Sequence, residues 1–350
     1  MKIAVYAIAL NEEKFVEQFY QSCQGADLVL IADTGSTDNT VKLAESLGVS
    51  VHKISIKPWR FDHARNAALA LIPADYDICI SLDLDEVLVD NWRQLVEDAW
   101  HKDTTRLQYR FNNGMGNIFN ATKIHARHGY AWHHLCHEMI EIDPRMKESW
   151  RVINDILIEH YPDRTKSRSQ YLPMLEASVK ERPQDHRDSW YLAREYFYEQ
   201  KWQKAIDEWN RYLALPTATW HHERSFALRH QGRCYQNLGL QGLALTAYRS
   251  AVDQSRFIRD TWLDLAQVCY DYRQWHECYY AATQALTITE REYVFTSTPE
   301  PWGWRLYDLA ALAAYNLKMK EQAIYYGGLA LEHNLNDERL IKNCEYYLSL

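Results

Sequence analysis

The most informative segment of the chain reads Asp77-Ile78-Cys79-Ile80-Ser81-Leu82-Asp83-Leu84-Asp85-Glu86. It is an apolar, strand-like run that ends in three carboxylates within four residues. Carboxylates crowded at the end of a strand repel one another, and Mg²⁺ or Mn²⁺ relieves that repulsion because these ions prefer oxygen ligands. The segment therefore indicates a metal–diphosphate site. The alternative is a solvated turn that opens a helix, where the helix dipole favours acids.

Strand-like and helix-like segments alternate on both sides of this run over the first ~100 residues. We expect strands over 3–10, 28–32, 51–56 and 77–82, and helices that start at 11–13, cover 41–47 and run from 62 to 73. This order predicts a mostly parallel α/β sheet, whose ligands bind beyond the carboxyl ends of the strands. Asn11, Asp33 and Asp83 to Asp85 all follow strands, so we expect them to converge on one crevice.

The second half of the chain reads as long helices rich in Ala, Leu, Tyr and Trp. Small residues recur there at one spacing in four copies: Ala193…Tyr196…Ala205…Trp209, Gly232…Tyr235…Ala244…Tyr248, Ala266…Cys269…Cys278…Ala282 and Ala311…Ala314…Ala323…Gly327. The third positions lie 39, 34 and 45 residues apart (205, 244, 278, 323), and 34 is the tetratricopeptide period. The spacing predicts an all-α tetratricopeptide-like solenoid over 169–350, with inserts between repeats, after an α/β domain over 1–168.

Composition excludes several classes of protein. The formal charge of 39 − 47 = −8 argues against nucleic-acid binding. The seven cysteines include no CxxC pair, which favours reduced thiols and a cytoplasmic location. No apolar run approaches the ~20 residues that span a bilayer, and the chain enters its first strand without a signal peptide.

With these features in view, the chain resembles family 2 glycosyltransferases of the bacterial and phage type, which have a GT-A (Rossmann-like) fold and here a C-terminal tetratricopeptide domain. The resemblance rests on six motifs in order: 11–13 (NEE), 33–40 (DTGSTDNT), 61–66 (FDHARN), 82–88 (LDLDEVL), 137–138 (HE), and 158–160 (IEH) with 166–168 (KSR). It implies inverting, metal-dependent transfer of a hexose from a nucleotide-diphosphate sugar, with UDP-sugar the expected donor and Mn²⁺ or Mg²⁺ the expected cofactor. The acceptor is a glycan or a protein, and the repeats present it or join copies into a homo-oligomer.

For the donor, the resemblance makes Asp83-Leu84-Asp85 the DxD motif. Asp85 is expected to ligate the metal, and Asp83 is expected to serve both the metal and the donor's sugar or ribose. A bound cation neutralises the charge that builds up on the leaving diphosphate. His160 is expected to complete the metal shell, with a structural histidine as the alternative. Glu86 is expected to start a helix.

The resemblance also assigns nucleotide-sugar contacts to Asn11, Asp33, Arg65 and Asn66. Simpler roles exist for three of them. Asp33 suits an Asx-turn and Asn11 a helix cap. Arg65 follows Asp62 by three positions and suits a surface ion pair on one helix face.

On the acceptor side, an inverting transfer needs a carboxylate that takes the acceptor's proton. Glu138 is the predicted catalytic base, with Glu141 or Asp143 as alternatives. His137 is expected to contact the nucleotide sugar. Lys166 and Arg168 are expected to contact its phosphates, unless that segment is a solvated linker.

Two other classes of function compete with this prediction. A nucleotidyltransferase also uses acidic metal ligands beside an α/β sheet, but it usually has a Gly-rich basic loop near its first strand, whereas residues 11–13 are acidic. A non-catalytic repeat scaffold with a vestigial glycosyltransferase domain is the other. The intact acids at 83–86 and Arg65 argue against such decay.

Overall fold

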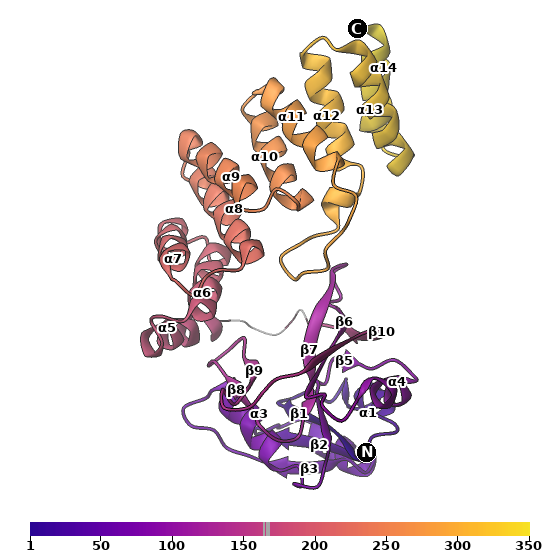
Figure 1. Cartoon of the computed structure of the whole chain (residues 1–350), viewed down its shortest axis with the longest axis vertical. Helices are drawn as coiled ribbons and strands as arrows, with labels where there is room; N and C mark the ends of the chain where they lie inside the picture. The colour runs from indigo at the N-terminus through magenta and orange to yellow at the C-terminus, as the bar shows by residue number, and fades with distance from the viewer. Residues whose placement is uncertain (164, 166–168) are drawn as a thin grey trace. The chain divides into compact units, whose positions relative to one another are not determined.

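The computed structural model describes residues 1–163, 165 and 169–350. It contains two compact units, Met1–Ser178 and Val179–Leu350 (Figure 1). The first unit runs past the predicted boundary after residue 168 and takes in most of the helix that follows, α5 (Tyr171–Glu181). Among the described residues, no helix combines the length and the apolar character needed to cross a membrane.

An eight-stranded mixed sheet forms the centre of the N-terminal unit, in the order β3-β2-β1-β4-β7-β6-β10-β5. Its strands are β1 (Ile3–Ala9), β2 (Leu28–Asp33), β3 (Ser50–Lys53), β4 (Ile78–Ser81), β5 (Glu86–Val87), β6 (Arg106–Asn112), β7 (Ile118–Ala126) and β10 (Trp150–His160). The helices are α1 (Val16–Ser22), α2 (Thr40–Ser46), α3 (Phe61–Ala70) and α4 (Trp92–Ala99), and a separate hairpin pairs β8 (Tyr130–His133) with β9 (Met139–Ile142).

The predicted parallel sheet is confirmed for its first four strands. β3, β2, β1 and β4 are parallel neighbours. Antiparallel β7 then joins β4 to β6, and β10 lies parallel to β6 and antiparallel to β5. The sheet is therefore parallel on one side and mixed on the other.

Both faces of the sheet are buried at β1, β2 and β4, which explains their continuous apolar sequences. Alternate residues of β1 point to opposite faces: Val5 joins a core with Phe19 of α1, and Tyr6 joins a core with Leu69 of α3. The strand ends are thus fixed by packing on two sides.

Two local expectations are wrong. No helix begins at residues 11–13, since α1 starts at Val16. Asn11 has a left-handed φ of 55°, and its backbone N–H donates to Ser36 Oγ at 2.9 Å, so this segment joins the loop after β2. Glu86 does not start a helix either; it lies in β5, buried, because its carboxylate bonds the turn before it.

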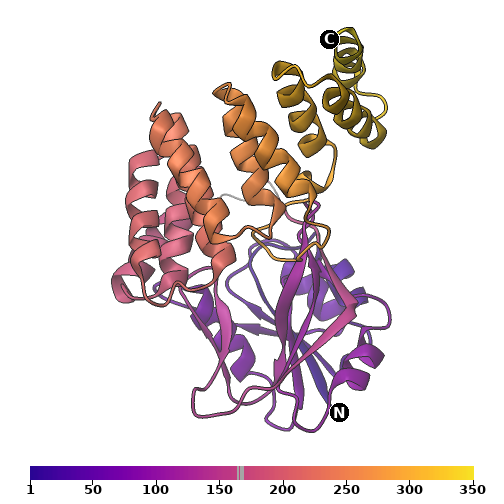
Figure 2. The ribbon, with the colours of Figure 1, turned by 45° about the horizontal axis from the view of Figure 1, so that its top comes forward.

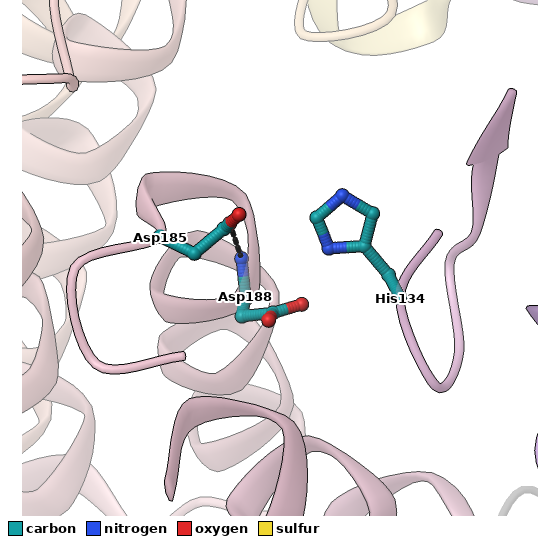
Figure 3. Close-up of side chains that lie close together, drawn as sticks. All are labelled: His134, Asp185 and Asp188. Carbon is teal, nitrogen blue, oxygen red and sulfur yellow. Dashed lines mark hydrogen bonds between the residues drawn. The ribbon is translucent and has the colours of Figure 1, made fainter. Parts of the chain in front are cut away.

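The predicted array of helix pairs is confirmed in the C-terminal unit, where consecutive helices pack as hairpins (Figures 1 and 2). The helices are α6 (His186–Tyr198), α7 (Trp202–Ala214), α8 (His221–Asn237), α9 (Gln241–Gln254), α10 (Arg259–Asp271), α11 (Trp275–Leu286), α12 (Arg305–Asn316), α13 (Lys320–His333) and α14 (Glu338–Ser349), with a 3₁₀ turn at Glu300–Trp302. Asp185 caps α6, because its carboxylate accepts the Asp188 N–H at 3.0 Å (Figure 3).

The recurring small residues are explained by close packing between helices. A Cβ added to Gly232 would lie 2.8 Å from the ring of Tyr248, and one added to Gly327 would lie 2.7 Å from the ring of Tyr347. Each position therefore admits a neighbouring aromatic ring only because it carries no side chain.

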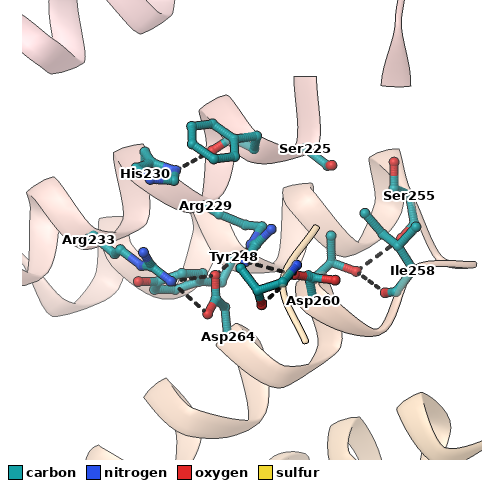
Figure 4. Close-up of polar contacts among 12 residues, drawn as sticks. Ser225, Arg229, His230, Arg233, Tyr248, Ser255, Ile258, Asp260 and Asp264 are labelled. Carbon is teal, nitrogen blue, oxygen red and sulfur yellow. Dashed lines mark hydrogen bonds and ion pairs between the residues drawn. The ribbon is translucent and has the colours of Figure 1, made fainter. Parts of the chain in front are cut away.

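A buried polar cluster joins α8 to α10 (Figure 4). Asp264 accepts hydrogen bonds from Arg229 Nε at 2.6 Å and from the Arg233 guanidinium at 3.1 Å. Asp260 lies 3.7 Å from Arg229 and accepts the Thr298 N–H at 2.9 Å. Burial raises the pKa of Asp260. Thr298 belongs to the long insert before α12, so this cluster also fixes the insert that the 45-residue interval predicts.

Candidate functional site

The first loops at the carboxyl edge of the sheet are held by their own side chains. Asp33, at the end of β2, is 1% exposed and accepts the N–H groups of Gly35 at 3.1 Å and Ser36 at 3.2 Å. The Asn11 side chain accepts the Thr37 N–H at 2.7 Å. The two predicted nucleotide contacts thus lie on adjacent loops, where their hydrogen bonds shape the loop backbone.

The DxD motif forms a tight turn after β4. The N–H of Glu86 donates to the carbonyl of Asp83 at 3.0 Å, and the N–H of Asp83 donates to Oε2 of Glu86 at 3.0 Å. Leu84, between the two aspartates, is buried in the core, so the turn directs it away from the two carboxylates. This reciprocal pair of bonds fixes the start and the end of the turn.

Arg65 of α3 joins the DxD motif to the predicted acceptor side. Its guanidinium donates to Asp83 Oδ1 at 2.6 Å and, through Nε, to Glu138 Oε1. The same group lies 5.0 Å from the centre of the Trp132 ring. Burial lowers the pKa of Arg65, but the charges of Asp83 and Glu138 raise it by more, so the residue stays cationic. The expected surface pair with Asp62 is absent from the described contacts of Arg65, since Asp62 pairs with Arg60 instead.

Lys123 of β7 is a second cation of the site, partly buried, that the motifs do not reveal. Its Nζ lies 2.7 Å from Glu86 Oε1 and 3.6 Å from Asp83 Oδ2. Burial lowers the pKa of Lys123, while the charges of Asp83 and Glu86 raise it by more. For Asp83, burial raises the pKa, but Arg65 and Lys123 hold it below the usual range. Burial raises the pKa of Glu86.

Asp85 and His160 form the other pair in the site. His160 Nε2 lies 3.2 Å from Asp85 Oδ2, and the N–H of Tyr161 donates to the carbonyl of Asp85 at 2.8 Å. Antiparallel pairing of β5 with β10 brings these segments together. Burial lowers the pKa of His160, and the Asp85 hydrogen bond and charge raise it by more.

The donor set fits a divalent cation in charge and in chemistry. Four carboxylates (Asp83, Asp85, Glu86, Glu138) face two fixed cations (Arg65, Lys123), so the cluster carries a formal excess of 4 − 2 = 2 negative charges with His160 neutral. Carboxylate oxygen with imidazole nitrogen is a donor pair that suits Mn²⁺. Within the described part of the N-terminal unit, however, no three such ligand atoms lie within 4.8 Å of one another. Asp85 and His160 are paired, whereas Asp83 turns to Arg65 and Lys123.

The remaining predicted residues are placed as follows. Asn66 bonds both backbone groups of Trp132, at 2.8 Å each, and so fixes β8 to α3. His137 has a left-handed φ of 52° and stacks on Tyr171, with ring centroids 5.5 Å apart. Of the alternative bases, Glu141 lies 3.6 Å from His134 and Asp143 is paired with Arg145. Lys166 and Arg168 lie outside the described residues.

Comparison with known proteins supports the resemblance seen in the sequence. Residues 5–137 match the family model described as Glycosyl transferase family 2. The chain is 33% identical over 97 residues to an uncharacterized glycosyltransferase of Rickettsia bellii, covering 27% of this chain and 32% of that protein. It is 29% identical over 101 residues to the lipopolysaccharide core biosynthesis glycosyltransferase LpsC of Rhizobium meliloti, covering 28% of this chain and 37% of LpsC. The match thus spans about a third of each relative.

Solved structures similar to the chain include tetratricopeptide proteins. One is MamA, with 16% identity and a TM-score of 0.40 over 51% of this chain and 99% of that chain. Another is YrrB, described as a TPR protein with an unusual peptide-binding site, with 12% identity and a TM-score of 0.41 over 50% of this chain and 82% of that chain. The predicted resemblance to family 2 glycosyltransferases is confirmed for the N-terminal unit by the family model.

Proposed function

We propose that the N-terminal unit transfers a hexosyl group, with inversion, from a nucleoside diphosphate sugar to a hydroxyl of a glycan or protein acceptor. The expected donor is a UDP-sugar, used with Mn²⁺ or Mg²⁺. One observation carries the proposal: the buried guanidinium of Arg65 binds both Asp83 of the DxD turn and Glu138. The predicted donor and acceptor carboxylates therefore belong to one cluster.

On the donor side, Asp85 and His160 would hold the cation, and Asp83 would accept hydrogen bonds from hydroxyl groups of the donor. The Asp83 side chain is 38% exposed although two cations pair with it, so one edge of its carboxylate remains accessible. A bound divalent cation would neutralise charge on the departing diphosphate.

On the acceptor side, Glu138 would take the proton of the attacking hydroxyl. Its Oε1 accepts from Arg65, which fixes the orientation of the carboxylate and leaves Oε2 for the substrate proton. Arg65 is itself 5% exposed and has protein acceptors for Nε and for both terminal nitrogens. We therefore assign it to orientation of the two carboxylates rather than to direct nucleotide contact.

We assign the helical array either to presentation of the acceptor or to self-association. Stacked helix pairs offer an extended surface for such contacts. Light scattering on the full chain separates the two roles, because self-association predicts a mass that is a multiple of 41.4 kDa.

A screen of nucleotide sugars tests the central proposal. The full chain is incubated with each donor and Mn²⁺, with and without chelator, and release of nucleoside diphosphate is measured for wild type, Asp85→Asn and Asp90→Asn. Asp90 is exposed and lies five positions further along, so it serves as the matched control.

We expect turnover of at least one donor, its loss with chelator and in Asp85→Asn, and wild-type turnover in Asp90→Asn. Absence of binding and turnover with every nucleotide sugar would contradict glycosyl transfer. Unchanged turnover in Asp85→Asn would contradict the metal role alone.

A further inference from the structure

The ion pair between partly buried Lys123 and buried Glu86 has no role in the mechanism above. Glu86 is 2% exposed, and its Oε1 lies 2.7 Å from Lys123 Nζ. A buried ion pair gains little net stability, because the desolvation cost of both charges offsets their attraction. An apolar pair of similar volume would serve packing equally well. A role in positioning groups of the site explains better than packing why Lys123 and Glu86 are charged.

The pair controls one end of the DxD turn. Glu86 uses Oε2 to accept the N–H of Asp83 at 3.0 Å and uses Oε1 to accept from Lys123. The Nζ of Lys123 lies 3.6 Å from Oδ2 of Asp83, and Oδ1 of the same carboxylate is bonded to Arg65. Both the backbone and the side chain of Asp83 are thus held from β7, through Lys123.

The Asp85 end of the turn is held separately. Its carbonyl is bonded to Tyr161, and its carboxylate faces His160, both through the pairing of β5 with β10. Among the described residues, the ion pairs of Lys123 are with Asp83 and Glu86 and not with Asp85. The two aspartates of one motif are therefore supported by different strands.

We propose that Lys123, together with Glu86, is a positioning residue for the sugar donor: it fixes the Asp83 carboxylate toward the donor and leaves the cation to Asp85 and His160. The inference rests on the proposed function and assigns distinct tasks to the two aspartates of the turn. It predicts that loss of the pair weakens donor binding while binding of the cation alone persists.

The test compares Lys123→Met, the double variant Lys123→Met/Glu86→Gln and the control Lys102→Met. Lys102 is an exposed lysine of the same unit. The double variant removes both charges of the pair, so neither charge is left without its partner. Its Tm shows whether the variant still folds. Mn²⁺ alone is titrated by electron paramagnetic resonance. Donor binding with Mn²⁺ is titrated by calorimetry with UDP-glucose, UDP-galactose, UDP-N-acetylglucosamine and GDP-mannose.

We expect the double variant to bind Mn²⁺ within about threefold of wild type and to bind the preferred donor about tenfold or more weakly, as loss of a charged hydrogen bond predicts. Its KM for that donor rises by the same factor. Lys102→Met matches wild type in both titrations.

Wild-type donor affinity in a folded double variant would overturn the positioning role and leave glycosyl transfer intact. Equal weakening of Mn²⁺ and donor binding would overturn the division between the two aspartates. A wild type that binds no sugar nucleotide would overturn both this inference and the proposed function.

Discussion

Arg65 and Glu138, 73 positions apart in the chain, form a buried ion pair in the N-terminal unit. The same guanidinium bonds Asp83, so α3 holds the donor turn and the acceptor-side carboxylate at once. The relative position of the DxD turn and Glu138 therefore depends on the fork geometry of one side chain.

Replacement of Arg65 by lysine should impair transfer although it keeps the charge. A single ammonium cannot bond Asp83 and Glu138 in the same planar arrangement, so we expect kcat/KM to fall by about 100-fold, equivalent to about 2.7 kcal/mol. Steady-state kinetics with the donor found in the screen measure the change. Arg145→Lys is the matched control, because Arg145 is exposed and pairs with nearby Asp143. Equal activity of the two variants would argue against the shared guanidinium.

The N-terminal unit should become less stable as the pH is lowered, because of His125. This histidine is fully buried, accepts from the Tyr6 hydroxyl at 3.0 Å and bonds the Ala126 carbonyl at 2.8 Å. Burial lowers its pKa to about 3, from 6.5 in the unfolded chain. Because the folded pKa lies below the unfolded one, acidification from 6.5 toward 3 protonates the unfolded state first and favours unfolding.

The expected size of this loss is about 1.4 kcal/mol per pH unit, or about 2 kcal/mol between pH 6.5 and pH 5. Urea unfolding across this range measures it for wild type, His125→Gln and the exposed control His101→Gln. His125→Gln should lack this part of the pH slope, whereas His101→Gln should retain it. An unchanged slope in His125→Gln would show that other groups cause the dependence.

Adjacent glycines of α13 should respond to alanine in opposite directions. A Cβ on Gly327 would lie 2.7 Å from the buried Tyr347 ring, whereas one on Gly328 would meet nothing within 4 Å. We expect Gly327→Ala to destabilise the protein by about 1–3 kcal/mol through overpacking. Gly328→Ala should stabilise it by about 0.5–1 kcal/mol through helix propensity. Chemical denaturation monitored by helix content gives both values, and the same sign for both would refute the packing explanation.

Removal of Arg229 should cost more than removal of Arg233, although both bond Asp264. The Arg229 side chain is 6% exposed and also lies near Asp260, whereas Arg233 is 40% exposed. Arg229→Met leaves two buried carboxylates poorly compensated, and we expect a loss of about 3 kcal/mol. Arg233→Met should cost about 1 kcal/mol or less. Thermal and denaturant unfolding of both variants measure the two losses of stability and so check their order.

The parallel half of the sheet was predictable because its strands are buried on both faces and therefore read as unbroken apolar runs. Ile78 to Ser81 is such a run, and its observed bounds differ little from the prediction. β7 was not predicted, because its residues 118–126 mix polar and apolar side chains and its pairing partners, β4 and β6, are defined only by the fold. The helical repeats were predictable from small residues alone, since positions such as Gly232 face an aromatic ring.

The site was predictable where a residue follows a strand within a motif, and not where its role comes from a distant partner. Asp83 and Asp85 were singled out from the local sequence and Arg65 from the family resemblance, and the fold brings Arg65 to Asp83. Lys123 was missed because a single lysine in a mixed strand gives no signal, and only the fold brings it to Glu86, 37 positions away. The prediction that Glu86 starts a helix was wrong for the same reason. The Glu86 carboxylate is bonded to the turn and to Lys123 of β7.

The pairing of β5 with β10 also sets the smallest piece of this chain that can hold the proposed site. The family match ends at residue 137, one position before Glu138 and well before His160. A fragment cut at the end of that match would lack β10, whose last residue His160 faces the Asp85 carboxylate, and Tyr161 after it, whose N–H bonds the Asp85 carbonyl. A domain border drawn from the match alone would therefore separate the DxD turn from β10, and with it the two halves of the proposed site.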